Sequence, residues 1–250
     1  MEDVIQTYLL PYDPAYPVVC FDEACKQLFG HASPPRRASP GQAARVDYEY
    51  ERKGVCHQLM MCEPLRGWRH VKVTERRTRR DYANCVRELV DAQYPRARRI
   101  RLVQDNLNTH DGASLYEAFA PAEARRILDK IEFHYTPKHG SWLNMAETEI
   151  NIMVRQCLDR RLDSQRLIAR EVAAWEKQRN TRRAKIHWTF TIASARRKLR
   201  KTYPSIEDWR NTSAGGVGRQ AKTPGLSQSG SSPWLRVDCA CPNLWANSPW

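Results

Sequence analysis

The sequence has no run of apolar residues that approaches the ~18 needed for a membrane-spanning helix. It also lacks a secretory signal pattern, because residues 1–3 are acidic and no apolar segment follows a basic start. Its 8 cysteines form no Cys-x-x-Cys pair and no Cys/His spacing typical of zinc sites, so we expect reduced, buried thiols. These absences exclude membrane, disulfide-stapled and zinc-module classes, and they predict a cytoplasmic protein with no membrane partner.

Acidic residues are the scarcer charge. The chain has 41 Lys+Arg against 28 Asp+Glu in 250 residues, which gives a net charge of +13. Many arginines occur in adjacent pairs, and the planar guanidinium group suits phosphate oxygens. A solvated basic surface is the alternative, but the number of pairs favours nucleic acid as the partner.

One stretch combines a strand pattern with a carboxylate at its end. Apolar residues at 100, 102 and 103 predict a strand that stops at Asp105 and Asn106, and a helix can begin near Asp111. In open α/β sheets the chemistry lies at such strand ends. Taken alone, Asp105 and Asn106 are better explained as the start of a turn. Carboxylates at other strand ends and on a helix favour a functional site instead.

The remaining pattern alternates strands and helices. A strand over 17–21 ends at Asp22 and Glu23, and a three-stranded antiparallel meander follows, with Gly54 at a turn. A long helix beginning near Asn144 carries Glu147. The expected strands are 17–21, 45–51, 55–62, 68–74, 100–104 and 132–136, and the expected helices are 4–10, 78–94, 113–130 (broken at Pro121), 144–158, 168–175 and 193–203.

This order predicts an α/β fold, an RNase H-like domain with a mixed central sheet flanked by helices. In that fold the first and fourth strands are neighbours about 4.8 Å apart, so Asp22 and Asp105 can share a metal ion. Glu147 can add a third oxygen ligand from a helix over the same edge. Glu149 is its rival, but two positions later it faces another side of the helix. Oxygen ligands predict Mg²⁺ or Mn²⁺, as two ions for phosphodiester chemistry.

Three motifs carry a family resemblance. They read Phe-Asp-Glu at 21–23, Val-Gln-Asp-Asn-Leu-Asn-Thr-His at 103–110, and His-Tyr-Thr-Pro-Lys-His-Gly-Ser-Trp-Leu-Asn-Met-Ala-Glu at 134–147. They resemble the mariner-type DDE transposases of bacterial insertion sequences (insertion sequence 630 family), over about residues 1–206. The resemblance implies a catalytic domain that cuts element ends and joins them to target DNA. It assigns catalysis and metal binding to Asp22, Asp105 and Glu147.

The resemblance also implies partners and supporting residues. We expect transposon-end and target DNA as partners, a homodimer, and association with the bacterial nucleoid. His110 and Asn144 would shape the site, and Glu23 and Asn106 would orient water or a neighbouring ligand. The interval from Asp105 to Glu147 is 147 − 105 = 42 positions, longer than usual in mariner-type relatives, and extra helix over 113–131 accommodates it.

Domain boundaries follow from composition. We expect an N-terminal helix and linker at 1–17, the catalytic domain at 18–206, and a disordered, non-homologous tail at 207–250. No helix-turn-helix module precedes Asp22, which suggests a truncated copy. Two functions therefore stay open: a metal-dependent DNA strand-cutting and strand-joining enzyme, or a catalytically idle DNA-binding or dimerisation remnant. A general RNase H-like nuclease is a weaker third. Trp142 and Trp175 are expected in core packing rather than base stacking.

Overall fold

The structure is a computed structural model that describes residues 1–138, 140–200 and 235–237. Most of the predicted tail at 207–250, and His139 in the third motif, lie outside the described residues. The elements are α1 (Glu2–Tyr8), β1 (Val18–His31), β2 (Tyr50–Glu63), β3 (Trp68–Thr74), α2 (Arg79–Glu88), the π-turn η1 (Leu89–Gln93), β4 (Ile100–Gln104), α3 (Ala113–Ala118), α4 (Pro121–Leu128), β5 (Ile131–Tyr135), the 3₁₀ turn η2 (Ser141–Leu143), α5 (Met145–Met153), the π-turn η3 (Val154–Leu158), α6 (Gln165–Arg182), β6 (Ile186–Trp188), α7 (Ile192–Lys198) and β7 (Leu235–Val237).

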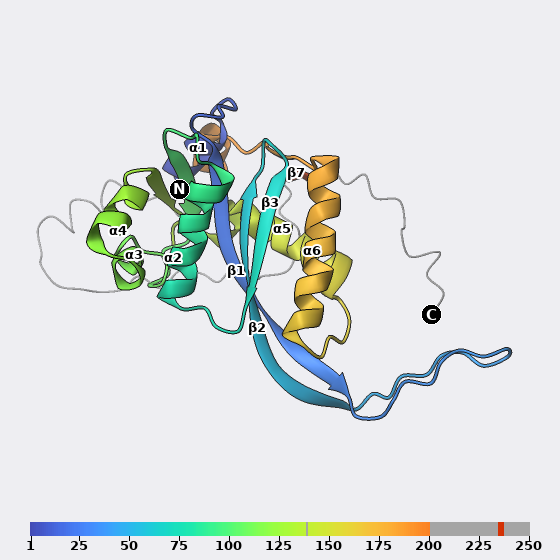
Figure 1. The fold of residues 1–250 in the computed structure, drawn as a ribbon. Helices are drawn as coiled ribbons and strands as arrows, with labels where there is room; N and C mark the ends of the chain where they lie inside the picture. Colours follow the sequence, from blue (N-terminus) through green and yellow to red (C-terminus); the bar gives the residue numbers. More distant parts are fainter. Residues whose placement is uncertain (139, 201–234, 238–250) are drawn as a thin grey trace, which may run out of the picture.

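Five strands form one mixed sheet in the order β3-β2-β1-β4-β5 (Figure 1). β1, β2 and β3 are an antiparallel meander, whereas β4 and β5 run parallel to β1. This confirms the predicted RNase H-like α/β fold, including the first and fourth strands as neighbours. A second, two-stranded sheet pairs β6 with β7.

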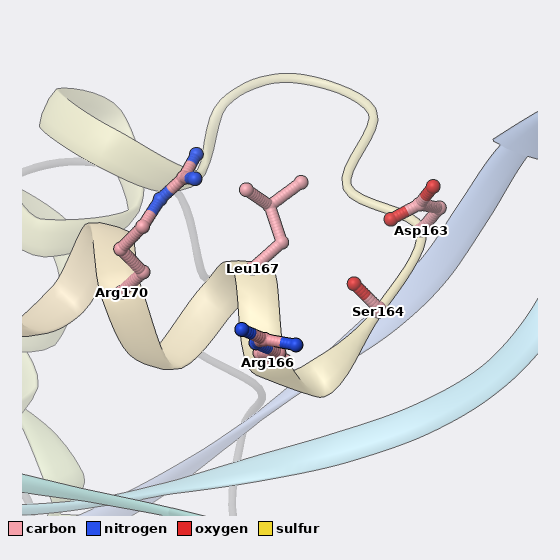
Figure 2. Close-up of a pocket in the computed structure, with 5 residues that line it drawn as sticks. All are labelled: Asp163, Ser164, Arg166, Leu167 and Arg170. Carbon is pink, nitrogen blue, oxygen red and sulfur yellow. The ribbon is translucent and has the colours of Figure 1, made fainter.

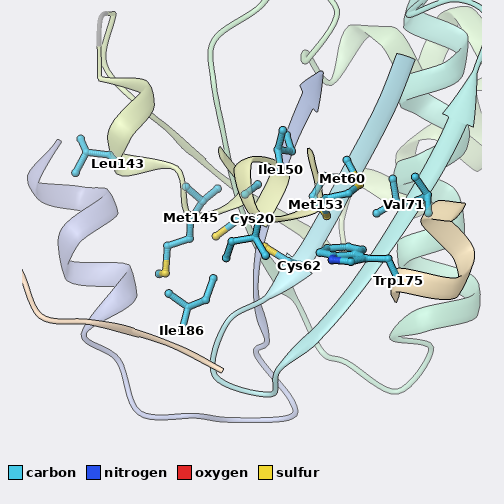
Figure 3. Close-up of a cluster of buried hydrophobic side chains, with 14 of the residues drawn as sticks. Cys20, Met60, Cys62, Val71, Leu143, Met145, Ile150, Met153, Trp175 and Ile186 are labelled. Atoms are coloured by element: carbon cyan, nitrogen blue, oxygen red, sulfur yellow. The ribbon is translucent and has the colours of Figure 1, made fainter. Parts of the chain in front are cut away.

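Helices cover both faces of the large sheet because side chains alternate along each strand. Val19 and Phe21 of β1 face the cluster formed with α2, α3 and α4. Cys20, between them, faces the opposite cluster, which α5 and α6 close (Figures 1 and 3). Figure 3 shows Met153 of α5 and Trp175 of α6 among the residues of that second cluster.

Several predicted strand boundaries are wrong. The two strands expected at 45–51 and 55–62 are one strand, β2, which begins at Tyr50. β1 does not end at Asp22 but continues to His31, and Gly54 lies inside β2 rather than at a turn. Both strands extend because they pair with each other from Cys20 opposite Cys62 to His31 opposite Tyr50, with one register shift near Gln27. Gly54 adopts a φ of +103° within this ribbon. The length of each strand is therefore decided by a pairing partner 50 − 31 = 19 to 62 − 20 = 42 positions away.

Local start signals are confirmed at three helices. Thr78 begins α2 with a reciprocal capping box to Asp81. Pro121 separates α3 from α4 at the first position of the second helix. Asn144 caps α5, since its side chain accepts a hydrogen bond from the Ala146 N–H at 3.1 Å.

Helix α1 belongs to the core of the structure. Val4 and Ile5 are fully buried, and Tyr8 donates a hydrogen bond to the Leu143 carbonyl oxygen at 2.8 Å. The division at residue 17 stays a prediction. Among the described helices, none combines the length and apolar character needed to cross a bilayer.

Among the residues that the structure describes, every cysteine is a free thiol. Cys20, Cys56, Cys62 and Cys85 are buried, as predicted for reduced thiols. Cys25 is exposed instead, because it lies on the outer part of β1, beyond the layers that cover the sheet.

Candidate active site

Asp22 lies within β1, and Asp105 directly follows the end of the neighbouring parallel strand β4. Cys20 of β1 pairs directly with Val103 of β4, and each aspartate lies two residues beyond its paired cysteine or valine. Since side chains alternate with a period of two, Asp22 lies on the same face of β1 as Cys20. That is the face covered by α5.

Glu147 approaches from the first turn of α5. The helix is tied to β1 at this end, because the Asn144 side-chain amide donates to the Phe21 carbonyl oxygen at 2.8 Å. Phe21 immediately precedes Asp22. One buried amide therefore fixes the start of the helix that carries Glu147 against the strand that carries Asp22.

The charges of Asp105 and Glu147 both act on Asp22. Burial and these two charges together raise the pKa of Asp22 to about 7, against a backbone hydrogen bond from Glu23 and the charge of His110, which lower it. Glu147 has one carboxylate oxygen, Oε2, that is buried without a hydrogen-bond partner. A buried acceptor of this kind is costly unless something satisfies it.

Asp105 and Glu23 share a buried histidine. His110 Nδ1 contacts the Asp105 carboxylate, and His110 Nε2 lies 3.6 Å from Glu23 Oε2, an ion pair too long for a hydrogen bond. Burial alone would lower the pKa of His110, but these two carboxylates outweigh it and raise that pKa to about 9. Burial by itself would raise the pKa of the Asp105 and Glu23 carboxyl groups. His110 outweighs burial and lowers the pKa of Asp105, and His110 together with Arg77 lowers the pKa of Glu23.

The His110 ring is held on every side. It lies 5.0 Å from the ring centroids of Phe21 and Tyr82. Gln104 donates to the His110 carbonyl oxygen at 2.7 Å and accepts from the Tyr82 hydroxyl at 2.7 Å. These contacts position His110 against the Asp105 carboxylate. Its role in shaping the site stays a prediction.

Glu149 is occupied elsewhere. It is fully buried, and its Oε1 accepts hydrogen bonds from Arg69 of β3 and Arg179 of α6, each at 2.9 Å. These two partners could not be predicted from the sequence, because they lie 80 and 30 positions away among many other arginines. Of the two glutamates on α5, only Glu147 influences Asp22.

The donor set fits a hard divalent cation, although it is not closed into a cluster. Among the residues that the structure describes, no three His, Cys, Asp or Glu side chains converge enough to hold a metal ion. Three like charges repel, and His110 draws the Asp105 carboxylate to its own side. The unsatisfied Oε2 of Glu147 and the carboxyl group of Asp22 still offer the oxygen ligands that Mg²⁺ and Mn²⁺ prefer.

The other residues singled out by the sequence have structural positions. Trp175 is buried and donates to Gln156 at 2.8 Å, and Trp142 packs edge-on against Phe190 at 5.7 Å. Both tryptophans therefore pack in the core, as predicted. Asn106 is exposed beyond the end of β4.

Residues 17–168, more than half of the chain, match the family model described as DDE superfamily endonuclease. No curated protein matches the sequence.

Solved structures with a similar fold include two complexes of Mos1 transposase. The Mos1 transposase paired-end complex with left transposon end has 14% identity and a TM-score of 0.47, covering 68% of this chain and 51% of that one. The Mos1 strand transfer complex has 15% identity and a TM-score of 0.45, covering 65% and 48%. The chain thus spans about half the length of these structures.

Proposed function

The chain belongs to the DDE superfamily endonucleases, and from this premise we propose that it is a metal-dependent enzyme that cuts and rejoins DNA strands in transposition. The observation that carries the proposal is the placement of Asp22 and Asp105, each two residues beyond the directly paired Cys20 and Val103, with the charges of Asp105 and Glu147 both raising the pKa of Asp22. The element it would mobilise is a bacterial insertion sequence of the mariner-like type. The three sequence motifs support that assignment.

Asp22, Asp105 and Glu147 would hold the cation, as Mg²⁺ or Mn²⁺ and as two ions. When bound, these ions activate a water or a 3′-hydroxyl and stabilise the leaving oxygen of the phosphodiester. The protein's own residues prepare the ligands. Asn144 fixes α5 against β1, and His110 holds the Asp105 carboxylate in one orientation.

His110 also carries positive charge at neutral pH, since its pKa is about 9. Placed between Asp105 and Glu23, this charge offsets part of the repulsion within the acidic site. Arg77 adds a second cation at Glu23. The site therefore tolerates several carboxylates in one place before a cation enters.

The net charge of +13 suits a long anionic substrate. We propose transposon ends and target DNA as partners, a homodimer as the working assembly, and the bacterial nucleoid as its location. The basic surface binds the polymer while the carboxylates serve the reacting phosphate.

The test is a strand-transfer and cleavage assay with a pre-nicked duplex that carries a free 3′-hydroxyl, in Mg²⁺ or Mn²⁺. We expect metal-dependent products from the wild type and at least a 100-fold loss in Asp22→Asn, Asp105→Asn and Glu147→Gln. Asp129→Asn is the matched control, because this exposed carboxylate lies at the end of α4. Equal products from Asp105→Asn and wild type would overturn the proposal.

Cation binding can be measured without DNA. A bound ligand stabilises the folded state, so Mn²⁺ should raise the melting temperature of the wild type more than that of Asp22→Asn or Glu147→Gln. The same rise in all three proteins would place the cation elsewhere.

A second candidate is a chain that binds DNA without cutting it, a remnant that competes with an intact transposase. The observation that favours it is the absence, among the described residues, of three converged metal ligands. Tight DNA binding with no metal-dependent product from the wild type would select this candidate.

A further inference from the structure

Cys20 of β1 and Cys62 of β2 lie directly opposite each other in the large sheet. Figure 3 shows both of them within the buried cluster beneath α5. Only 0% and 1% of their surfaces are exposed. Among the strands that the structure describes, they are the only two cysteines paired with each other. The chemistry proposed above uses neither thiol.

The backbone separation of this pair suits a disulfide bond. Residues directly opposite each other in an antiparallel pair have Cα atoms about 4.5 or 5.5 Å apart, depending on the type of pair. A disulfide needs about 4.4 to 6.8 Å between the two Cα atoms. The side chains are also in contact, since the Cys62 thiol hydrogen-bonds to that of Cys20. The two sulfurs can therefore be joined without a change in strand register.

Helix α1 covers the pair. The Tyr8 hydroxyl lies 3.4 Å from Cys20 Sγ and donates to the Leu143 carbonyl oxygen at 2.8 Å. A cavity of about 10 Å³ beside Tyr8, lined also by Met145 and Ile186, is hardly large enough for one water molecule. An oxidant of more than a few atoms therefore cannot reach the thiols while α1 is in place.

A larger hollow lies elsewhere. It has a volume of about 570 Å³ and lies at the start of α6, where Figure 2 shows the residues that line it: Asp163, Ser164, Arg166, Leu167 and Arg170. Neither cysteine is among these residues, so the hollow provides no route to the pair.

Local opening of α1 can uncover the two thiols. The helix has seven residues, too few to be stable without its packing against the domain. Its polar contacts include the Tyr8 hydrogen bond and the contact of Asp3 with His134 at 2.8 Å. Small elements of this kind open while the rest of a domain stays folded.

We propose that Cys20 and Cys62 are a redox-sensitive dithiol, which a small disulfide oxidises to a bond between β1 and β2 when α1 opens. One cysteine, as the thiolate, attacks a sulfur of the small disulfide RSSR, which breaks its S–S bond and forms a mixed disulfide. The other cysteine then attacks the protein sulfur of that mixed disulfide. Two RSH molecules leave with the two thiol protons, so two electrons pass from the cysteines to the small disulfide.

In the closed protein the pair stays in the thiol form. The hydrogen bond with Cys20, and then burial, raise the pKa of the Cys62 thiol, and a thiol is a far weaker nucleophile than a thiolate. Oxidation joins residues 62 − 20 = 42 positions apart, which restricts the unfolded chain and stabilises the fold. The bond lies two residues before Asp22, so it holds β1 to β2 beside the candidate site.

The test incubates the full chain with bis(2-hydroxyethyl) disulfide in the absence of denaturant and then blocks the free thiols. A Cys25→Ser/Cys56→Ser variant serves for mapping, because trypsin then releases the peptides 1–26 and 54–66 with one cysteine each. We expect these two peptides to be cross-linked, and dithiothreitol to separate them. The oxidised protein should melt about 5 to 15 °C above the reduced protein.

The role of α1 has its own measurement. Tyr8→Phe should form the disulfide about 3- to 10-fold faster than the wild type, because it loses the hydrogen bond to Leu143 and α1 opens more often. Tyr12→Phe is the matched control, with the same chemical change at an exposed residue. Circular dichroism verifies that both variants are folded.

Three results would contradict the proposal. Cross-linking that appears only in urea would show that the folded protein never uncovers the pair. A bond from Cys20 or Cys62 of the wild type to some other cysteine would show that the two are not redox partners. Equal oxidation rates in Tyr8→Phe and Tyr12→Phe would exclude α1 as the element that opens. The inference does not rest on the proposed function, because each readout is made on the thiols without DNA or metal.

Discussion

Asn144 joins the two halves of the candidate site with one side chain. Its carbonyl oxygen caps α5 and its amide nitrogen donates to Phe21 of β1, so a single residue faces both the helix of Glu147 and the strand of Asp22. Loss of either hydrogen bond should therefore shift Asp22 or Glu147, the proposed metal ligands. A role of Asn144 in positioning these ligands can be distinguished by experiment from its role as a helix cap.

Asn144→Ala should cost about 1 to 3 kcal/mol of stability, because it removes a helix cap and leaves a buried carbonyl oxygen unsatisfied. It should also lower strand-cutting activity at least tenfold under conditions where the variant stays folded. Thr191→Ala is the control, since the Thr191 side chain also caps a helix, α7, by accepting a hydrogen bond from the Ser194 N–H. Chemical denaturation and the cleavage assay measure the two effects, and equal activity in the two variants would contradict the positioning role.

Glu147 and Glu149 should respond in opposite ways to the same substitution. Glu149→Gln leaves two buried guanidinium groups without their shared carboxylate, and should cost about 3 to 5 kcal/mol of unfolding free energy. Glu147→Gln should change stability by less than about 1 kcal/mol while abolishing metal-dependent cleavage. Urea melts and the cleavage assay on both proteins decide this. A large stability loss in Glu147→Gln with activity retained would reverse the assignment.

His70 should make stability depend on pH. Its Nδ1 lies 3.1 Å from Glu176 of α6 and its Nε2 lies 3.2 Å from Glu88 of α2, which also pairs with Lys72. The hydrogen bond with Glu176, with a smaller contribution from Glu88, raises the pKa of His70 despite its burial.

Because the folded-state pKa is the higher one, this stabilisation is complete below the unfolded-state pKa of about 6.5 and is lost as the pH rises through the folded-state value. His70→Gln should therefore be less stable than the wild type at pH 5.5, with the gap narrowing as the pH rises. Thermal melts across pH 5.5 to 9 measure it. A gap that widens with pH would show that the histidine is neutral when folded.

Gly67 should tolerate no side chain. It has a φ of +71°, and a Cβ there would lie 2.5 Å from the backbone of Arg183, at the end of α6. Gly67→Ala should cost about 2 to 5 kcal/mol, from strain and overlap together. Gly54→Ala shares the positive φ but meets nothing within 4 Å, so about 1 kcal/mol is expected there. Similar losses in the two variants, by denaturant titration, would show that strain alone matters.

The fold was largely predictable because its signals are local or repetitive. The apolar alternation of β4, the capping box at Thr78 and the break at Pro121 all specify elements without distant partners. The prediction of a turn at Gly54 was wrong because glycine is typical of both turns and distorted strands. The outer half of β1 is mostly polar, and only its pairing with β2 makes it a strand.

The candidate site was predictable in its strand positions but not in its supporting contacts. The proximity of Asp22 and Asp105 follows from strand order, since β1 and β4 are neighbours that run parallel. The clasp of Glu149 by Arg69 and Arg179 joins residues far apart in the chain, and no short motif encodes it. Metal ligation by Asp22, Asp105 and Glu147 stays a prediction.

The burial of α1 has a practical consequence for anyone preparing the domain. The family match begins at residue 17 and ends at 168, yet the cluster beneath α5 also takes Ile5 from before that range and Trp175 and Ile186 from after it. A fragment trimmed to the matched range would lose α1 and most of α6, and so uncover part of that side of the sheet. Such a fragment should be insoluble on expression, so the folding unit is wider at both margins than the stretch by which relatives are recognised.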